Sequence, residues 1–121
     1  MQIQLDNGQQ NIQIIDYCDD HVVINNESYR LPLLITRDKI VSSNFPESPS
    51  LLTKDHLLYL FNLEPELILL GTGTKSQFLP TELDSFCHQH NQVIDCMATD
   101  AACRTFMLLA SEQRRVIALL F

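Results

Sequence analysis

Leu67-Ile68-Leu69-Leu70, followed at once by Gly71-Thr72-Gly73, is the stretch of sequence that decides the predicted fold. A short, wholly apolar run before a glycine turn is typical of a central strand that is covered on both faces. From Thr53 onward, segments with helical spacing of apolar residues alternate with such runs, in the order helix, strand, helix, strand, helix, strand. This alternation indicates an α/β unit with at least partly parallel strand pairing.

The helices and strands expected after residue 52 follow from apolar spacing and from residues that favour helix starts. Thr53 can cap the first helix, Pro80 suits the first turn of the second, and Thr99 or a neighbour caps the third. The expected elements are a helix over 53–61, a strand over 67–70, a helix over 80–90, a strand over 93–96, a helix over 99–111 and a strand over 115–121.

The first half of the chain has a different pattern, in which short apolar runs are separated by turn residues. Asp19-Asp20 and Asn25-Asn26 mark two turns, and two prolines within 45–50 mark a connecting loop. Strands are expected over 11–18, 21–24, 31–35 and 39–41. These strands must extend the sheet of the α/β unit or form an additional N-terminal β layer.

Length and composition indicate one globular domain over residues 1–121. The chain is 45% hydrophobic and 19% charged, and it is long enough to bury a core without disulfides or metals. It has 8 basic and 15 acidic residues, which give a net charge of -7, and the basic residues are scattered along the sequence. A nucleic-acid partner is therefore not expected.

The hydrophobic segments bear on where the protein is located. No apolar run approaches the roughly 20 residues that cross a bilayer. The start of the chain, Met1-Gln2-Ile3-Gln4, lacks the basic and apolar regions of a signal peptide. The sequence predicts a cytoplasmic protein that does not insert into a membrane.

The four cysteines, Cys18, Cys87, Cys96 and Cys103, have no Cys-x-x-Cys spacing. They are expected to be reduced thiols that pack as small hydrophobic side chains. Cys87 and His90 have the spacing of two metal ligands on a helix, but two ligands do not make a closed zinc site. There is also no nucleophile elbow or Ser/His/Asp order, so no metal, cofactor or catalytic residue is predicted.

Two polar loops, 71–76 and 95–100, directly follow the two buried strands. If these strands are parallel, both loops lie at the same edge of the sheet, where open α/β folds bind ligands. The hydroxyls of Thr72 and Thr99, the amine of Lys75 and the amides near the glycines could hold an anion there. The segment matches neither the P-loop pattern nor Gly-x-Gly-x-x-Gly. The alternative is a tight turn that lets the third helix pack closely.

Arg104 is placed about one turn into the third helix, which is apolar on nearly all sides. Such a helix is expected to be buried on more than one side. A buried arginine needs a carboxylate or carbonyl partner, and Asp95 is the expected one. Two hypotheses remain open for Arg104: a structural ion pair, or an anion contact at the floor of a pocket.

Four segments together resemble the ordered signatures of a known family. They are, in chain order, Leu69-Leu70-Gly71-Thr72-Gly73, Phe78-Leu79-Pro80, the run from Met97 to Phe106, and Arg114-Arg115-Val116-Ile117-Ala118. The family comprises small α/β domains of unknown biochemical function. It includes a mitochondrial assembly factor of respiratory complex I and an adipogenesis-associated cytosolic protein. The resemblance covers residues 51–121 well and the N-terminal strands loosely.

The resemblance implies a three-layer domain with a central mixed sheet, helices packed on it, an additional N-terminal β layer, and no established cofactor or reaction. The family pattern has Tyr-Asn where this chain has Phe106-Met107. The third helix thus lacks a hydroxyl and an amide that could take part in chemistry. The residues that match the family are Gly71, Thr72, Gly73, Met97, Thr99, Ala102, Arg104 and Thr105.

Two functions remain open. The first, implied by the resemblance, is a non-catalytic protein that binds another protein, as an assembly-type factor for a respiratory or membrane-associated complex. The second is a small-molecule or anion-binding protein, or an enzyme, that uses residues 71–73 and 95–104 at the sheet edge. The candidate binding residues are Gly71, Thr72, Gly73, Asp95, Met97, Thr99, Arg104 and Thr105.

The cysteine spacing leads to a first prediction. Protein that is denatured without reductant should present four reactive thiols, because no pair of the cysteines is expected to form a disulfide. Titration with a thiol reagent directly after purification measures this number. A count below four in fresh material would contradict the prediction.

Overall fold

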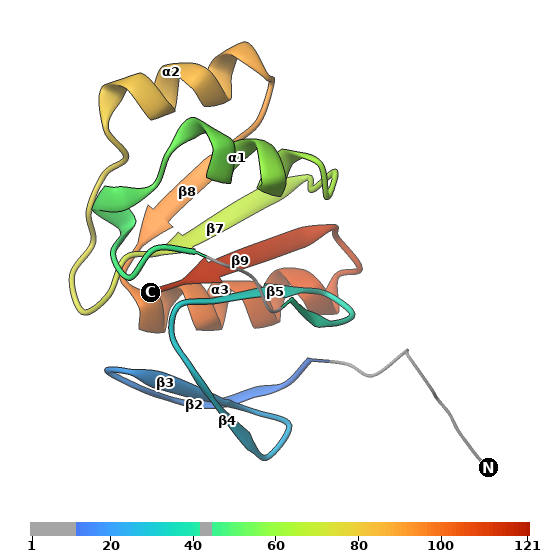
Figure 1. Cartoon of the computed structure of the whole chain (residues 1–121). Helices are drawn as coiled ribbons and strands as arrows, with labels where there is room; N and C mark the ends of the chain where they lie inside the picture. The colour runs from blue at the N-terminus through green and yellow to red at the C-terminus, as the bar shows by residue number, and fades with distance from the viewer. Residues whose placement is uncertain (1–11, 42–44) are drawn as a thin grey trace.

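Two β-sheets and three α-helices form the part of the chain that the computed structural model describes, residues 12–41 and 45–121 (Figure 1). The helices are α1 (Lys54–Phe61), α2 (Thr81–Gln89) and α3 (Thr99–Ser111), with a 3₁₀ turn at Pro49–Leu51. The smaller sheet contains β2 (Ile14–Cys18), β3 (His21–Ile24) and β4 (Glu27–Arg30). The larger sheet contains β5 (Leu33–Thr36), β6 (Ile40–Val41), β7 (Leu67–Gly71), β8 (Ile94–Met97) and β9 (Val116–Leu120).

The larger sheet is mixed, with the strand order β6-β5-β9-β7-β8. β7 pairs in parallel with β8 and with β9, whereas β5 pairs antiparallel with β9 and with β6. All five residues of β9 are buried, and this strand lies at the centre of the sheet. Because β7, β8 and β9 are parallel, their carboxyl ends lie at the same edge of the sheet.

Figure 1 shows the layers: α1 and α2 lie on one face of the larger sheet, and α3 and the smaller sheet lie on the other. Successive strand residues point to opposite faces. Ile68 and Leu119 therefore pack in the core beneath α1 and α2, while Leu69 and Ala118 pack in a second core with Phe106 of α3. Residues of β3 also belong to this second core. The predicted α/β fold, with a central mixed sheet and an additional N-terminal β layer, is confirmed.

Local sequence explains where several of these elements begin. The side chain of Thr53 caps α1 and accepts a hydrogen bond from the His56 N–H at 3.4 Å, as predicted. Asn25 and Asn26 have φ angles of 51° and 72°, the left-handed conformation that their turn requires. Pro80 is the N-cap of α2 and does not belong to its first turn.

The strands near residue 30 differ from the prediction. The sequence gives no clear signal for β4, because only Tyr29 in this strand is even partly buried. The strand predicted over 31–35 begins at Leu33, since Pro32 has no N–H to donate to a sheet. The prediction over 11–18 begins at a residue outside the described ones, and β2 starts at Ile14.

The prediction that α3 is buried on more than one side is confirmed in part, because the helix packs against the larger sheet and also against β2, while one stripe of it is exposed. Ala102, Cys103 and Phe106 are buried, and Cys103 lies on the side that faces β2. On the opposite side, Arg104 is exposed, and Leu108 is exposed although it is apolar. Apolar composition therefore does not reveal the one stripe of this helix that faces solvent.

The central position of β9 leads to a second prediction. Truncation after Arg115 should leave the chain unfolded or insoluble, because it removes the strand that β5 and β7 both pair with. Each buried Leu, Ile or Val contributes roughly 1.5–3 kcal/mol, and a small domain has only about 5–15 kcal/mol of stability. Thermal melting beside the full-length chain tests this. A native-like transition in the truncated protein would show that β9 is dispensable.

Candidate functional site

The two polar loops predicted to meet do so at the carboxyl ends of β7 and β8. The Gly73 N–H donates a hydrogen bond to Oγ1 of Thr99 at 2.8 Å, and the Thr99 N–H donates to the Gly73 carbonyl oxygen at 2.8 Å. The Phe121 N–H, just after β9, donates to the Gly71 carbonyl oxygen at 2.9 Å. We call this meeting point of residues 71–73, Thr99 and Phe121 the strand-end junction.

The Thr99 side chain lies inside this junction and is fully buried. Its hydroxyl accepts the hydrogen bond from Gly73 and donates one to the Phe121 carbonyl oxygen at 2.7 Å. The sequence analysis expected Thr99 or a neighbour to cap α3, and the N-cap is the neighbouring Ala98, whose side chain makes no capping hydrogen bond. The Thr99 hydroxyl joins three segments of the chain.

Thr72 is also buried, and its polar groups are engaged. Its N–H donates to the Met97 carbonyl oxygen at 2.8 Å, while its Oγ1 lies 2.7 Å from the Lys75 carbonyl oxygen and 3.1 Å from that of Met97. The Gln77 N–H donates to the same Oγ1 at 3.1 Å. The hydroxyl that an anion would need is thus committed to the shape of the loop.

The two glycines suit the geometry of the junction. A Cβ on Gly71 would lie 3.0 Å from Cα and Oγ1 of Thr99 and 3.1 Å from Cδ2 of Leu120, so these neighbours would have to shift by a few tenths of an ångström. Gly73 has a φ of 102°, a conformation that residues with side chains rarely adopt. These features fit the alternative of a tight turn beneath a closely packed helix. Anion binding at this edge stays a prediction.

Three of the candidate residues lie away from the junction. Asp95 is exposed and sits opposite Leu69 in the middle of β8. The Arg104 side chain is 73% exposed, and its Nη1 lies 3.5 Å from Oδ2 of Asp100, one turn earlier on α3. The prediction that Asp95 is the partner of Arg104 is therefore wrong, because Arg104 is on the solvent side of the helix. Thr105, the next residue, is half-buried.

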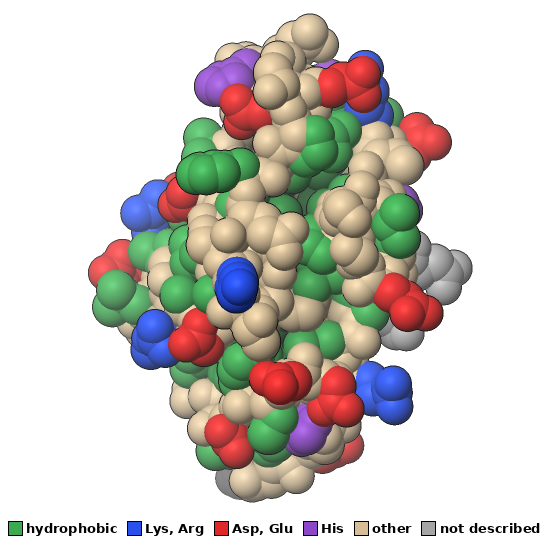
Figure 2. All heavy atoms as spheres, turned by 90° about the vertical axis from the view of Figure 1, so that its left-hand side faces the viewer, with side chains coloured by type: hydrophobic (Ala, Val, Ile, Leu, Met, Phe, Trp, Pro, Cys, Tyr) green, Lys and Arg blue, Asp and Glu red, His purple; other side chains and the backbone are tan. Residues whose placement is uncertain are grey.

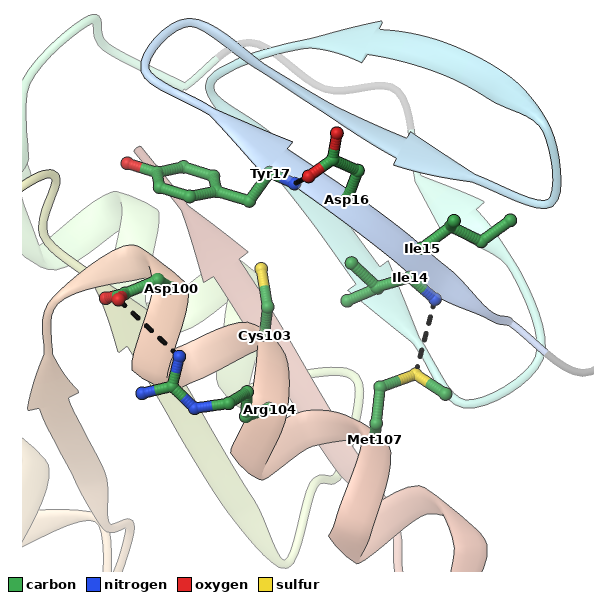
Figure 3. A pocket seen from close by; sticks show the side chains of 8 residues that line it. All are labelled: Ile14, Ile15, Asp16, Tyr17, Asp100, Cys103, Arg104 and Met107. Atoms are coloured by element: carbon green, nitrogen blue, oxygen red, sulfur yellow. Dashed lines mark hydrogen bonds and ion pairs between the residues drawn. The ribbon is translucent and has the colours of Figure 1, made fainter.

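A groove of about 600 Å³ lies between β2 and α3 (Figure 3). It is lined by residues 14–17 of β2 and by Asp100, Cys103, Arg104 and Met107 of α3. Arg104 is the one candidate binding residue that the groove shares with the sequence analysis. The consecutive apolar residues Ile14-Ile15 are the signal that could have identified its other wall, since adjacent strand residues cannot both face the same core.

The buried thiols are poor nucleophiles. Burial, and then the negative charge of Asp100, raise the pKa of the Cys103 thiol to about 11. Burial, and then Asp84, raise the pKa of Cys87 to about 11 as well. At neutral pH both thiols are therefore protonated, and they are unreactive because the thiolate is the reactive form.

All four cysteines are free thiols, as Cys18 and Cys96 also lack a disulfide partner.

Tyr17 contributes a polar group that the protein leaves unused. Its hydroxyl is buried and has no hydrogen-bond partner among the described residues. Burial, followed by the charge of Asp19, raises the pKa of this hydroxyl, and the Thr99 hydroxyl beside it lowers it again in part. Thr99 lies outside hydrogen-bond geometry from Tyr17, and its own hydroxyl already has two partners. Tyr17 is therefore a neutral side chain at physiological pH.

Fold and site together define a class of protein: a small three-layer α/β domain whose strand-end loops are closed by their own hydrogen bonds. Within residues 12–41 and 45–121, no three His, Cys, Asp or Glu side chains are grouped to hold a metal ion. The chain belongs to the family described as "Protein of unknown function (DUF498/DUF598)", whose model matches residues 14–121. This match confirms the resemblance to a family of small α/β domains of unknown function.

Similar proteins come from several bacteria. A "13 kDa major membrane protein" of Francisella tularensis subsp. holarctica (strain LVS) is 29% identical over 102 residues, or 84% of this chain and 83% of that protein. A Xanthomonas campestris protein solved by NMR has a TM-score of 0.85 at 27% identity, covering 95% of this chain and 87% of that one.

Two further solved structures bear on fold and location. An outer membrane protein from Bartonella henselae has a TM-score of 0.77 at 29% identity, covering 92% of this chain and 94% of that one. A Mth938-like domain from Bordetella pertussis has a TM-score of 0.76 at 20% identity, covering 100% of this chain and 92% of that one. At this identity the similarity shows the fold alone. In the described part of this chain, no helix is long and apolar enough to cross a membrane. A cytoplasmic location stays a prediction.

The strand-end junction leads to a third prediction. Thr99→Val keeps the shape of the side chain but leaves the Gly73 N–H and the Phe121 carbonyl without their partner, so it should destabilise the fold. Each buried group left unsatisfied costs about 1–3 kcal/mol. Thr99→Ser keeps the hydroxyl and should lose less. Urea unfolding of both variants measures the difference. Equal losses would mean that the methyl group, and not the hydroxyl, holds the junction.

Proposed function

We propose that this protein is a non-catalytic factor that binds another protein and serves a respiratory or other membrane-associated complex, in the manner of an assembly factor. The observation that carries the proposal is an aromatic side chain held almost wholly in solvent. Phe78 is 95% exposed, and it lies in the loop between β7 and α2. The start of this loop is fixed by the hydrogen bonds of Thr72.

A hollow with a partly apolar lining lies close to Phe78 in the chain. It has a volume of about 390 Å³, lies between the starts of α1 and α2, and is lined by Leu52, Pro80 and Leu83 together with the polar or charged Thr53, Lys54, Asp55 and Glu82. Leu51, which is 59% exposed, directly precedes one wall, and Phe78 is two residues before the other. Figure 2 views the side of the molecule on which this loop lies and shows hydrophobic side chains gathered around a hollow.

Exposed apolar surface of this kind favours binding of a protein over catalysis. Single exposed apolar residues are common, but an almost fully exposed aromatic residue close to a hollow with apolar and charged walls is typical of the anchor residues of protein interfaces. The buried thiols, with their raised pKa values, and the engaged hydroxyls of the strand-end junction offer no comparable argument for an enzyme.

Similar proteins support the membrane-associated part of the proposal. One relative is named as a major membrane protein, and one solved structure as an outer membrane protein. The resemblance to a family with a complex I assembly factor supports the assembly role. The partner that fits these observations is a subunit of a membrane-bound complex that presents an apolar pocket or groove to Phe78.

A photo-crosslinking amino acid in place of Phe78 tests this proposal in living cells. The substituted protein should form a covalent adduct with one or a few membrane-complex subunits, because a bound partner would cover this position. The same amino acid in place of Val93 is the matched control, since Val93 is 58% exposed and directly precedes β8. No adduct at Phe78, or the same adducts at both positions, would contradict the proposal. Thermal melting of Phe78→Ala should be unchanged.

A further inference from the structure

β2 is an edge strand whose outer side lacks a strand partner in the described part of the chain. The order of the smaller sheet is β2-β3-β4, so one side of β2 pairs with β3, and the other side has no strand partner among residues 12–41 and 45–121. An open edge presents backbone N–H and C=O groups that can pair with an additional strand. Figure 3 shows that this side of β2 is directed toward α3.

Two backbone N–H groups on this edge have substitute acceptors in place of a strand. The Ile14 N–H donates to the Met107 sulfur at 3.4 Å, and a thioether is a weak acceptor. The Tyr17 N–H donates to the carboxylate of its neighbour Asp16 at 2.8 Å. Both acceptors belong to flexible side chains, so a peptide carbonyl oxygen could replace either of them without disturbing the sheet.

The groove described above runs beside this edge, with α3 as its other wall. A strand edge that faces a helix across a groove is the arrangement in which extended peptides bind by strand addition. The peptide backbone then pairs with the edge strand, and alternate side chains enter the groove. The volume of about 600 Å³ is within the range of roughly 300–1,000 Å³ for sites that bind small ligands.

The two ends of the groove differ in character. Around Ile14, Ile15 and Met107 it is apolar, and Ile15 is 59% exposed. Around Tyr17 it is acidic, since Asp16 and Asp100 line it there, and Asp100 and Asp19 both act on the Tyr17 hydroxyl. Arg104 lies 3.5 Å from Asp100 and offsets part of this charge. The net charge of the chain, -7, has the same sign.

We propose that the open edge of β2 and the facing side of α3 bind an extended peptide segment of a partner protein by strand addition. The peptide places an apolar side chain between Ile15 and Met107 and a Lys or Arg side chain near Asp100. A second copy of this chain fits less well, because pairing two β2 edges would bring the carboxylates of Asp16 on both copies together. The groove shares no residue with the Phe78 surface, so the two proposals can fail independently.

Selection from a phage-displayed library of random peptides against the full-length protein tests the proposal. Enriched peptides should carry an apolar residue and a Lys or Arg an even number of positions away, so that both side chains enter the groove. Ile15→Lys should weaken the most enriched peptide by about tenfold or more, because it adds a like charge and removes an apolar contact. Val93→Lys is the control with matched exposure, and this variant and Phe78→Ala should both bind normally.

NMR titration with the same peptide locates the binding site. The amide signals of Ile14 and Tyr17 should move, because a carbonyl acceptor replaces the sulfur of Met107 and the carboxylate of Asp16. The absence of any enriched peptide, or an enriched peptide that still binds Ile15→Lys, would overturn the proposal. So would movement of these two signals with protein concentration alone, which would identify a second copy as the occupant.

Discussion

The arrangement of this domain depends on the two hydrogen bonds of the Thr99 hydroxyl. It accepts a hydrogen bond from the turn after β7 and donates one to the residue after β9, at the point where α3 begins. A hydroxyl can do both at once because it carries one donor and two acceptor sites. The Thr99 side chain is fully buried, and its hydroxyl holds the ends of two parallel strands and the start of one helix together.

The position of α3 follows from this contact. Gly71 lets the helix backbone approach β7 closely, since a side chain there would push Thr99 away by a few tenths of an ångström. With the start of α3 fixed so closely to the sheet, Ala102, Cys103 and Phe106 face inward and Arg104 is left in solvent. The same orientation directs Met107 toward β2 and forms the groove between them.

The parts of this fold that could be predicted are those with local signals. The apolar run of β7 and the cap of α1 can each be recognised from a few consecutive residues. β4 could not be found, because a strand that exposes most of its side chains has little apolar pattern. The insertion of β9 between β5 and β7 depends on partners far apart in the chain, and the mixed sheet was implied by resemblance and not by spacing.

The candidate site shows the same division. That residues 71–73 and 99 meet could be predicted, because parallel strands have their carboxyl ends at one edge. The sequence could not show that the Thr99 hydroxyl is already hydrogen-bonded. Its acceptor is the Phe121 carbonyl oxygen, and no local pattern connects that residue to α3. The exposure of Arg104 was missed for a related reason. The composition of α3 is apolar on all sides, and only the packed structure shows which side the sheet covers.

Closure of the strand-end junction has a consequence for where ligands can bind. Open α/β sheets bind ligands beyond the carboxyl ends of their strands, where the N–H groups at helix starts are free. In this protein the Thr99 N–H is bonded to Gly73, and the Ala101 N–H is bonded to the carboxylate of Asp100. An anion at this edge would therefore compete with the chain's own hydrogen bonds for these two N–H groups. Two other surfaces, the exposed side chain of Phe78 and the outer edge of β2, offer groups that a protein partner can contact.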